Sequence, residues 1–222
     1  MEKVDELLLQ VRTAHRLLAA YYQRLLPTIS DIASQLELTF CNWGNADFDL
    51  PAAARYDITD YWQWDLLPGL NTSYLYGQFD SKDKVKVGEF LVELMVVSDT
   101  AIDSHFEGHD SEPDALELVM SAEEAESILR ITVCAPYQSF DGRWYNSVWS
   151  GTAYPEFMKT PKPEKDTNGE PCFLAGFECP LSHLMSDDGV QNIILRTKQF
   201  IDKTVAAARK ESNKHKSECG TA

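Results

Sequence analysis

The chain has 222 residues, of which 44% are hydrophobic and 11% aromatic, and this composition supports a packed core and excludes a mainly disordered chain. No apolar run approaches the ~20 residues that a membrane-spanning helix needs, and the acidic first ten residues do not fit a signal peptide. The net charge of −15 disfavours contact with nucleic-acid backbones and favours basic partners or cations.

The first predicted element is a helix over residues 3–26. Pro27 has no backbone N–H and clashes with the carbonyl four residues before it, so the helix is expected to end or kink there and to resume over 28–36. Apolar or small side chains recur at 3-4 spacing through the first segment, at Val4, Leu7, Val11, Ala14, Leu18, Tyr21 and Leu25.

The middle of the chain changes to a period of two, which predicts strands. In residues 85–97 the apolar side chains of Phe90, Val92, Leu94 and Val96 alternate with Glu89 and Glu93. Such alternation is typical of an antiparallel sheet with one covered face and one wetter face. Strands are predicted over residues 38–43, 73–79, 85–97, 128–135, 143–150 and 172–179, with a long exposed loop over 155–171.

A second long helix is predicted to follow the acidic turn at 187–189 and to carry basic residues toward its end near 210. The whole pattern predicts an α+β fold in which a single antiparallel sheet of about six strands is flanked by long N- and C-terminal helices packed on one face. Residues 1–210 are expected to form one domain and 211–222 a flexible C-terminal tail.

Both terminal helices have an apolar stripe that must be covered. If one sheet face is too small for both, the N-terminal helix becomes the seam of a homodimer. Packing of both helices within one chain is the favoured alternative.

The cysteine pattern predicts reduced thiols and a cytoplasmic protein. The number is odd, no CxxC pair occurs, and a chain of this length does not need disulfides to fold. The cysteines are Cys41, Cys134, Cys172, Cys179 and Cys219.

The acidity is concentrated in residues 87–129, which contain no Lys or Arg. Inside this stretch Asp103, His105, Glu107 and His109 alternate, so an extended backbone would place all four side chains on one side. Imidazole and carboxylate groups in that arrangement are suitable ligands for Zn²⁺ or another divalent cation. The alternative is an acidic loop in which the histidines only neighbour carboxylates, and no cofactor is then expected.

Aromatic and acidic residues also gather in a second region. Trp and Tyr are enriched at protein–protein contacts, and aromatic rings beside carboxylates suit a cationic ligand or an arginine-rich peptide. Core packing under the 44–72 connection is the alternative interpretation. The residues predicted to bind a partner are Asp57, Asp60, Trp62, Trp64, Asp65, Tyr74 and Tyr76.

Sequence signatures of nucleotide-binding, hydrolase and zinc enzymes are absent from the chain. The sequence therefore favours a non-enzymatic interaction protein, of the adaptor, chaperone or inhibitor type, whose acidic and aromatic surface binds a basic protein or peptide. A divalent-metal-dependent hydrolase centred on residues 103–110 is the first alternative. An acidic mimic of nucleic acid is the second.

Overall fold

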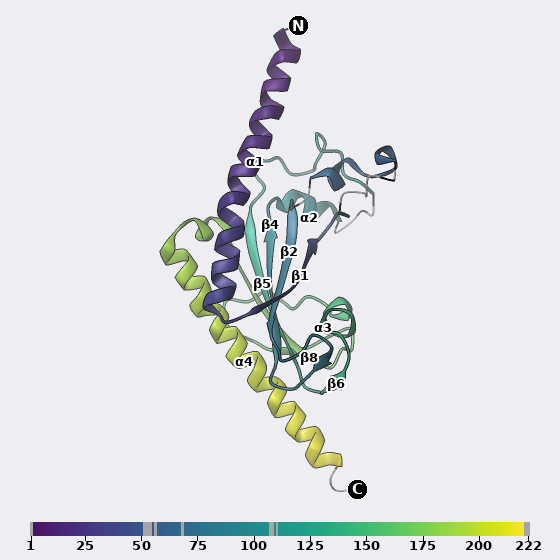
Figure 1. Cartoon of the computed structure of the whole chain (residues 1–222), viewed down its shortest axis with the longest axis vertical. Coiled ribbons are helices and arrows are strands. Elements are labelled where there is room, and N and C mark those ends of the chain that lie inside the picture. The colour runs from purple at the N-terminus through teal and green to yellow at the C-terminus, as the bar shows by residue number, and fades with distance from the viewer. Residues whose placement is uncertain are drawn as a thin grey trace.

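The computed structural model describes residues 2–50, 55, 57–67, 69–106, 109 and 111–219. Long helices begin and end the fold, α1 over Glu2–Gln35 and α4 over Asp187–Cys219, and their outer ends lie at opposite ends of the long axis of the molecule (Figure 1). The short helical segments are α2 (Thr100–Phe106), α3 (Trp144–Ser147) and the 3-10 turns η1 (Ile58–Asp60), η2 (Gln63–Leu66), η3 (Trp149–Gly151) and η4 (Leu181–Met185).

Within the described residues, six strands form one antiparallel sheet in the order β1-β2-β4-β5-β8-β7. A separate short ribbon pairs β3 (Lys84–Val85) with β6 (Phe140–Asp141). The predicted α+β fold, with an antiparallel sheet between two terminal helices, is confirmed. The strands of the sheet are β1 (Thr39–Asn45), β2 (Asn71–Gln78), β4 (Phe90–Val97), β5 (Ile128–Pro136), β7 (Glu164–Lys165) and β8 (Cys172–Pro180).

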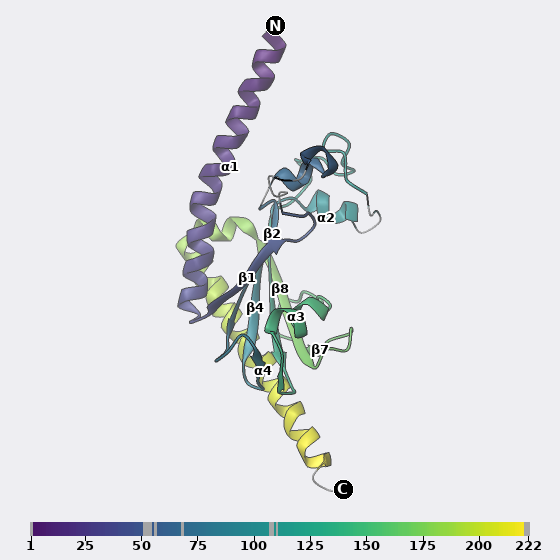
Figure 2. The same ribbon diagram turned by 45° about the vertical axis from the view of Figure 1, so that its right-hand side comes forward.

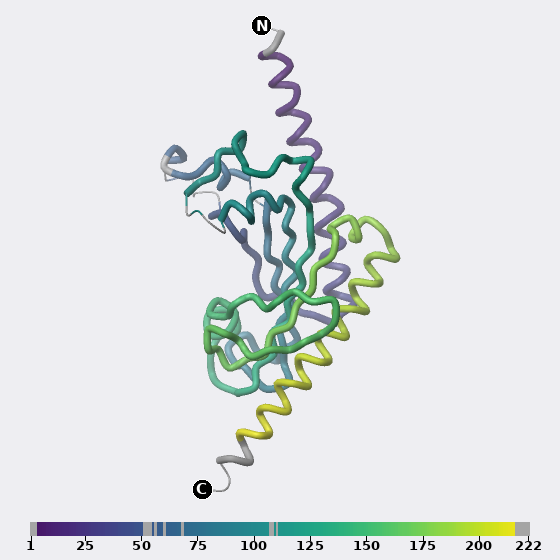
Figure 3. The backbone as a smooth tube through the Cα atoms, turned by 180° about the vertical axis from the view of Figure 1, so that it is seen from behind, coloured from purple at the N-terminus to yellow at the C-terminus, as the bar shows by residue number. Residues whose placement is uncertain are grey.

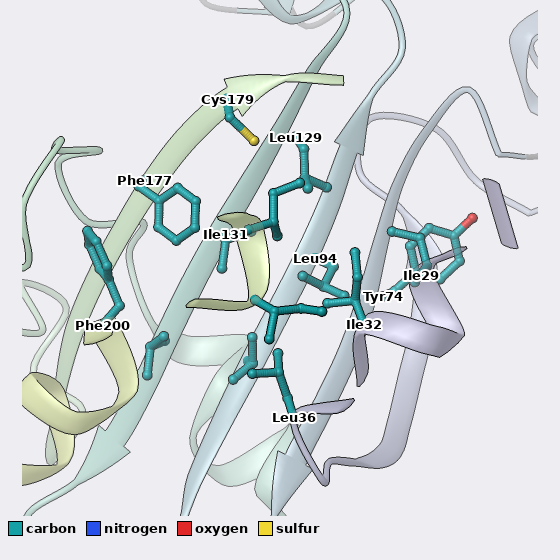
Figure 4. Packing of buried hydrophobic residues seen from close by; sticks show 14 of the residues in the cluster. Ile29, Ile32, Leu36, Tyr74, Leu94, Leu129, Ile131, Phe177, Cys179 and Phe200 are labelled. Atoms are coloured by element: carbon teal, nitrogen blue, oxygen red, sulfur yellow. The ribbon is translucent and has the colours of Figure 1, made fainter. Parts of the chain in front are cut away.

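Both terminal helices cover the same face of the sheet, as the sequence predicts. The alternate residues of β4 and β5 that face the helices are fully buried, because the apolar stripes of α1 and α4 remove them from water. The phenolic hydroxyl of Tyr22 also anchors α1 by donating to the carbonyl oxygen of Gly69 at 2.7 Å. The side chains labelled in Figure 4 meet in this core: Ile29, Ile32, Leu36, Tyr74, Leu94, Leu129, Ile131, Phe177, Cys179 and Phe200.

The opposite face of the sheet is also covered, so the predicted wetter face is wrong at the centre. Every residue of β4 is buried, including Glu93. Over the half of the sheet that lies away from α2, this face is covered by α3 (Figure 1). Trp144 of α3 packs there with Leu91, Cys134 and Leu174 in a second core. The segment over 143–150 was predicted as a strand, but it forms α3 and η3 instead.

The helix boundaries also differ from those predicted. Pro27 does not end α1, which runs unbroken to Gln35. The hydroxyl of Thr28 donates to the carbonyl oxygen of Arg24 at 2.9 Å, which adds a local bond where proline removes one. At the other end α4 continues to Cys219, beyond its expected end near residue 210. No helix in the described part of the chain is long and apolar enough to cross a bilayer.

Candidate functional site

An aromatic cluster lies at the end of the sheet that is nearer to the free end of α1. It joins the segment after β1 with η2 and α2, which lie close together in Figures 1 and 2. The ring of Phe48 stacks on Trp64 with centroids 5.5 Å apart, and Trp62 stacks on Phe106 at 6.4 Å. The indole N–H of Trp64 donates to the carbonyl oxygen of Pro113 at 2.7 Å. These contacts hold both indole rings in place, and both side chains remain half-buried.

One side of this cluster borders a hollow of about 500 Å³, here called the Asp47 hollow. Asp65 is buried in its wall and accepts a hydrogen bond from the backbone N–H of Asp49 at 3.0 Å. Asp47 accepts from the side-chain amide of Asn71 at 2.7 Å. The lining residues are Asn45, Ala46, Asp47, Phe48, Asp49, Tyr61, Trp62 and Asp65.

Burial raises the pKa of the Asp47 carboxyl above its ordinary value. The hydrogen bond from Asn71 and the charge of Arg130 lower the same pKa, while the carboxylate of Asp103 raises it. The carboxylate of Asp47 is therefore incompletely neutralised by its surroundings. A cation in the hollow would stabilise its charged form.

A second hollow, of about 520 Å³, borders Trp64 and is here called the Glu112 hollow. Glu112 is oriented by the backbone N–H of Gln63, which donates to its Oε1 atom at 2.7 Å. Its lining residues are Gln63, Trp64, Leu67, Glu112, Pro113, Asp114 and Ala115. Residues of η2 therefore contribute to both hollows.

The two hollows share one chemical character. Their described lining contains five carboxylates, from Asp47, Asp49, Asp65, Glu112 and Asp114, and neither Lys nor Arg. The guanidinium group of Arg130, whose charge reaches Asp47, is itself ion-paired with Asp103 at 2.6 Å and with Glu178 at 2.8 Å. Carboxylates beside tryptophan faces attract ammonium and guanidinium groups through charge and through the ring quadrupole.

The predicted metal segment has a different conformation from the expected one. Asp103 and His105 lie in the helix α2, so the extended backbone predicted for them is wrong. Asp103 forms an ion pair with Arg130, and the rings of His105 and His109 stack with centroids 4.9 Å apart. Glu107 lies outside the described residues. In the part of the chain that the structure describes, no three His, Cys, Asp or Glu side chains gather as metal ligands. The metal site stays a prediction.

The residues predicted to bind a partner do not share one surface. Trp62, Trp64 and Asp65 line the hollows, whereas Tyr74 and Tyr76 pack against the helix-covered core on the other face of the sheet. Asp57 accepts hydrogen bonds from the backbone and hydroxyl of Thr59, which lower its pKa. Asp60 ends η1, and its side chain lies outside the described set.

Sequence reasoning missed the four acidic residues Asp47, Asp49, Glu112 and Asp114. The first two lie in the segment after β1 and the others about 65 residues later in the chain, so no local pattern joins them. The sequence signal that was available is the absence of Lys and Arg from residues 87–129, which contain Glu112 and Asp114.

A protein-family model described as PM0109 matches residues 1–207 of the chain. A similar protein, described as "Uncharacterized protein PM0109" from Pasteurella multocida (strain Pm70), is 26% identical over 208 residues. The match covers 89% of this chain and 94% of that relative. No solved structure matches the chain.

Proposed function

The chain belongs to the PM0109 family, and for this member we propose a non-enzymatic interaction protein that binds a basic protein partner through the Asp47 and Glu112 hollows. The observation that carries the proposal is the pair of hollows around η2, lined by carboxylates and indole rings. Each hollow receives one cationic side chain, and an arginine is favoured because its flat guanidinium group both stacks on an indole and pairs with a carboxylate.

The indole rings of the site are held in place before any ligand binds, and this order supports binding of a specific partner more than a general attraction of cations. Stacking with Phe48 and Phe106 and the bond to Pro113 hold the indole rings of Trp62 and Trp64 in place. Binding of a partner therefore costs little free energy for immobilising these side chains. Two hollows also allow two arginines of one peptide to bind together, which increases affinity through effective concentration.

The proposal is tested with a blocked peptide, Gly-Arg-Gly-Gly-Arg-Gly, titrated into the protein at physiological salt while tryptophan fluorescence or heat is recorded. We expect D47N/D49N to weaken binding about tenfold, because a desolvated cation–ring and carboxylate contact contributes about 1–2 kcal/mol. E112Q/D114N is expected to have a similar effect. A peptide in which citrulline replaces one arginine leaves one hollow without a cation. One of the two double variants should then bind this peptide as tightly as the wild type does.

The matched control is E117Q/E123Q, which changes the net charge equally. Both glutamates are exposed and lie outside the described linings of the two hollows. Screening limits the effect of remote charges, so this variant should weaken binding less than threefold. If it weakens binding as much as D47N/D49N does, net charge alone explains the affinity and the proposed site is wrong.

A further inference from the structure

The N-terminal half of α1 extends beyond the rest of the fold, and Figures 1, 2 and 3 show it standing apart from the loops beside it. This part of the helix is rich in leucine. Its large apolar side chains are between 41% and 65% exposed: Val4, Leu7, Leu8, Leu9, Val11, Leu17 and Leu18. Scattered apolar residues on a surface are ordinary, but such a concentration on one helix indicates an interface.

The exposed residues continue the stripe that packs on the sheet. At 100° per residue, Leu7, Val11 and Leu18 lie on the same side of α1 as the buried Leu25 and Ile32. One apolar stripe therefore runs along the whole helix. The sheet covers its C-terminal half, and its N-terminal half has no cover within the described chain.

The projecting end of α4 does not share this property. Its last turns, after Ala208, consist mainly of Lys, Glu, Ser and Asn. A helix end that extends into water needs no leucine. The stripe of α1 is therefore not a general consequence of extending beyond the body.

We propose that a second copy of the chain covers this stripe by pairing its own α1 in antiparallel orientation. Charge favours that occupant. Residues 2–6 contain three carboxylates and one lysine, whereas residues 7–30 contain Arg12, Arg16, Arg24 and His15 and no carboxylate. In an antiparallel pair the acidic end of each helix lies opposite residues 19–23 of the other helix, between Arg16 and Arg24. The two helix dipoles then run in opposite directions, which is the favourable arrangement. A parallel pair would place like charges side by side.

The stripe sets the register of the pair. Positions 4, 7, 11, 14, 18 and 21 occupy alternating a and d positions of a heptad. In the antiparallel register that uses all of them, Leu7 faces Leu18 of the second copy and Val11 faces Ala14. Val4 lies beside Tyr21, which already packs in part against the core of its own chain. Twofold symmetry repeats each of these contacts. This contact does not involve the hollows around η2.

The oligomeric state is tested by light scattering on the full-length protein over about a hundredfold range of concentration. The wild type is expected to be a dimer that dissociates on dilution. L7S/L18S removes two leucines from the stripe and should raise the dissociation constant at least about a hundredfold. The control L9S/L17S removes two leucines from outside the stripe that are 55% and 65% exposed, against 58% and 41% for Leu7 and Leu18. It carries the same loss of helix propensity and should change the constant less than about fivefold.

Cross-linking tests the orientation. In a background with Cys41 and Cys219 replaced by serine, L7C and L18C chains are oxidised separately and as a mixture. Antiparallel pairing yields a covalent dimer only in the mixture, because positions 7 and 18 face each other. Covalent dimers of L7C alone would overturn the proposed orientation.

A wild-type protein that is monomeric at every concentration would overturn the interface. Equal effects of L7S/L18S and L9S/L17S on the dissociation constant would also overturn it. A monomer that binds anionic phospholipid vesicles would assign the stripe to a membrane surface instead.

Discussion

Replacing Glu93 with glutamine is expected to stabilise the fold by about 3 kcal/mol at pH 8 and to have little effect at pH 4.5. Glu93 lies at the centre of β4 and is fully buried. Its Oε1 atom accepts hydrogen bonds from the hydroxyl of Ser73 at 2.5 Å and from that of Tyr154 at 3.1 Å. Its Oε2 atom makes no well-formed hydrogen bond among the described residues, but the hydroxyl of Thr132 on the neighbouring strand lies close enough to lower the pKa of the carboxyl.

The expected sign follows from the pKa of this carboxyl. Burial raises it from 4.5 to about 7, while hydrogen bonding by Ser73, Tyr154 and Thr132 and the charge of Arg130 lower it by less. Between pH 4.5 and 7 the folded state keeps a proton that the unfolded state has released. The free energy of unfolding therefore falls as pH rises through this window and levels off above pH 7.

Glutamine keeps the shape of the side chain and an oxygen that accepts from Ser73 and Tyr154, but it has no charge to bury. Urea unfolding at pH 5, 6, 7 and 8 measures the difference, with the exposed Glu117→Gln as a variant of equal charge change. The free energy of unfolding of Glu93→Gln should change less with pH than that of the control. An E93Q protein that is less stable than the wild type at pH 8 would show that the carboxylate is satisfied in the fold.

Trp144→Ala is expected to lower the free energy of unfolding by about 3–5 kcal/mol. Trp144 is fully buried on the face of the sheet opposite the long helices, where its ring stacks against Phe79 at 6.0 Å. Its removal leaves a cavity over Leu91, Cys134 and Leu174.

Trp144→Phe separates packing from hydrogen bonding. The indole N–H is buried and has no partner within the described chain, so phenylalanine removes a polar atom that is left unpaired while keeping most of the volume. Its expected cost is below about 1.5 kcal/mol. Urea unfolding with an unchanged m-value tests both variants. Equal destabilisation by alanine and phenylalanine would indicate that the indole nitrogen makes an important bond.

The fold class could be predicted from the sequence because its main signals are local. The 3-4 spacing of apolar residues marks α1 and α4, alternation marks β5, and a nearly continuous apolar run marks β4. The failures occur where tertiary contacts override a local pattern. Residues 143–150 have aromatic and β-branched side chains typical of a strand, but burial of Trp144 over the sheet favours a helical turn there.

The candidate site could be predicted only in part, for a related reason. Trp62, Trp64 and Asp65 are neighbours in the sequence, and their local composition predicts them as candidates; the structure places all three around the hollows. The hollows also need Asp47 and Glu112, which the fold brings to η2 from distant segments. Alternation predicts which face of its strand Glu93 occupies, but it cannot show whether another element covers that face. Glu93 was therefore predicted on the wetter side, although it is buried.

The unbroken course of α1 through Pro27 has a consequence for distances between binding sites. Residues buried against the sheet and residues in the projecting half belong to one helix, with no joint between them. Whatever binds the projecting half is therefore carried on the same continuous helix that packs on the sheet. In a pair of chains joined through α1, the hollows of the two chains would be connected through helix, which rises about 1.5 Å per residue, and not through a flexible linker. A partner with two basic segments would then be selected by the spacing between them.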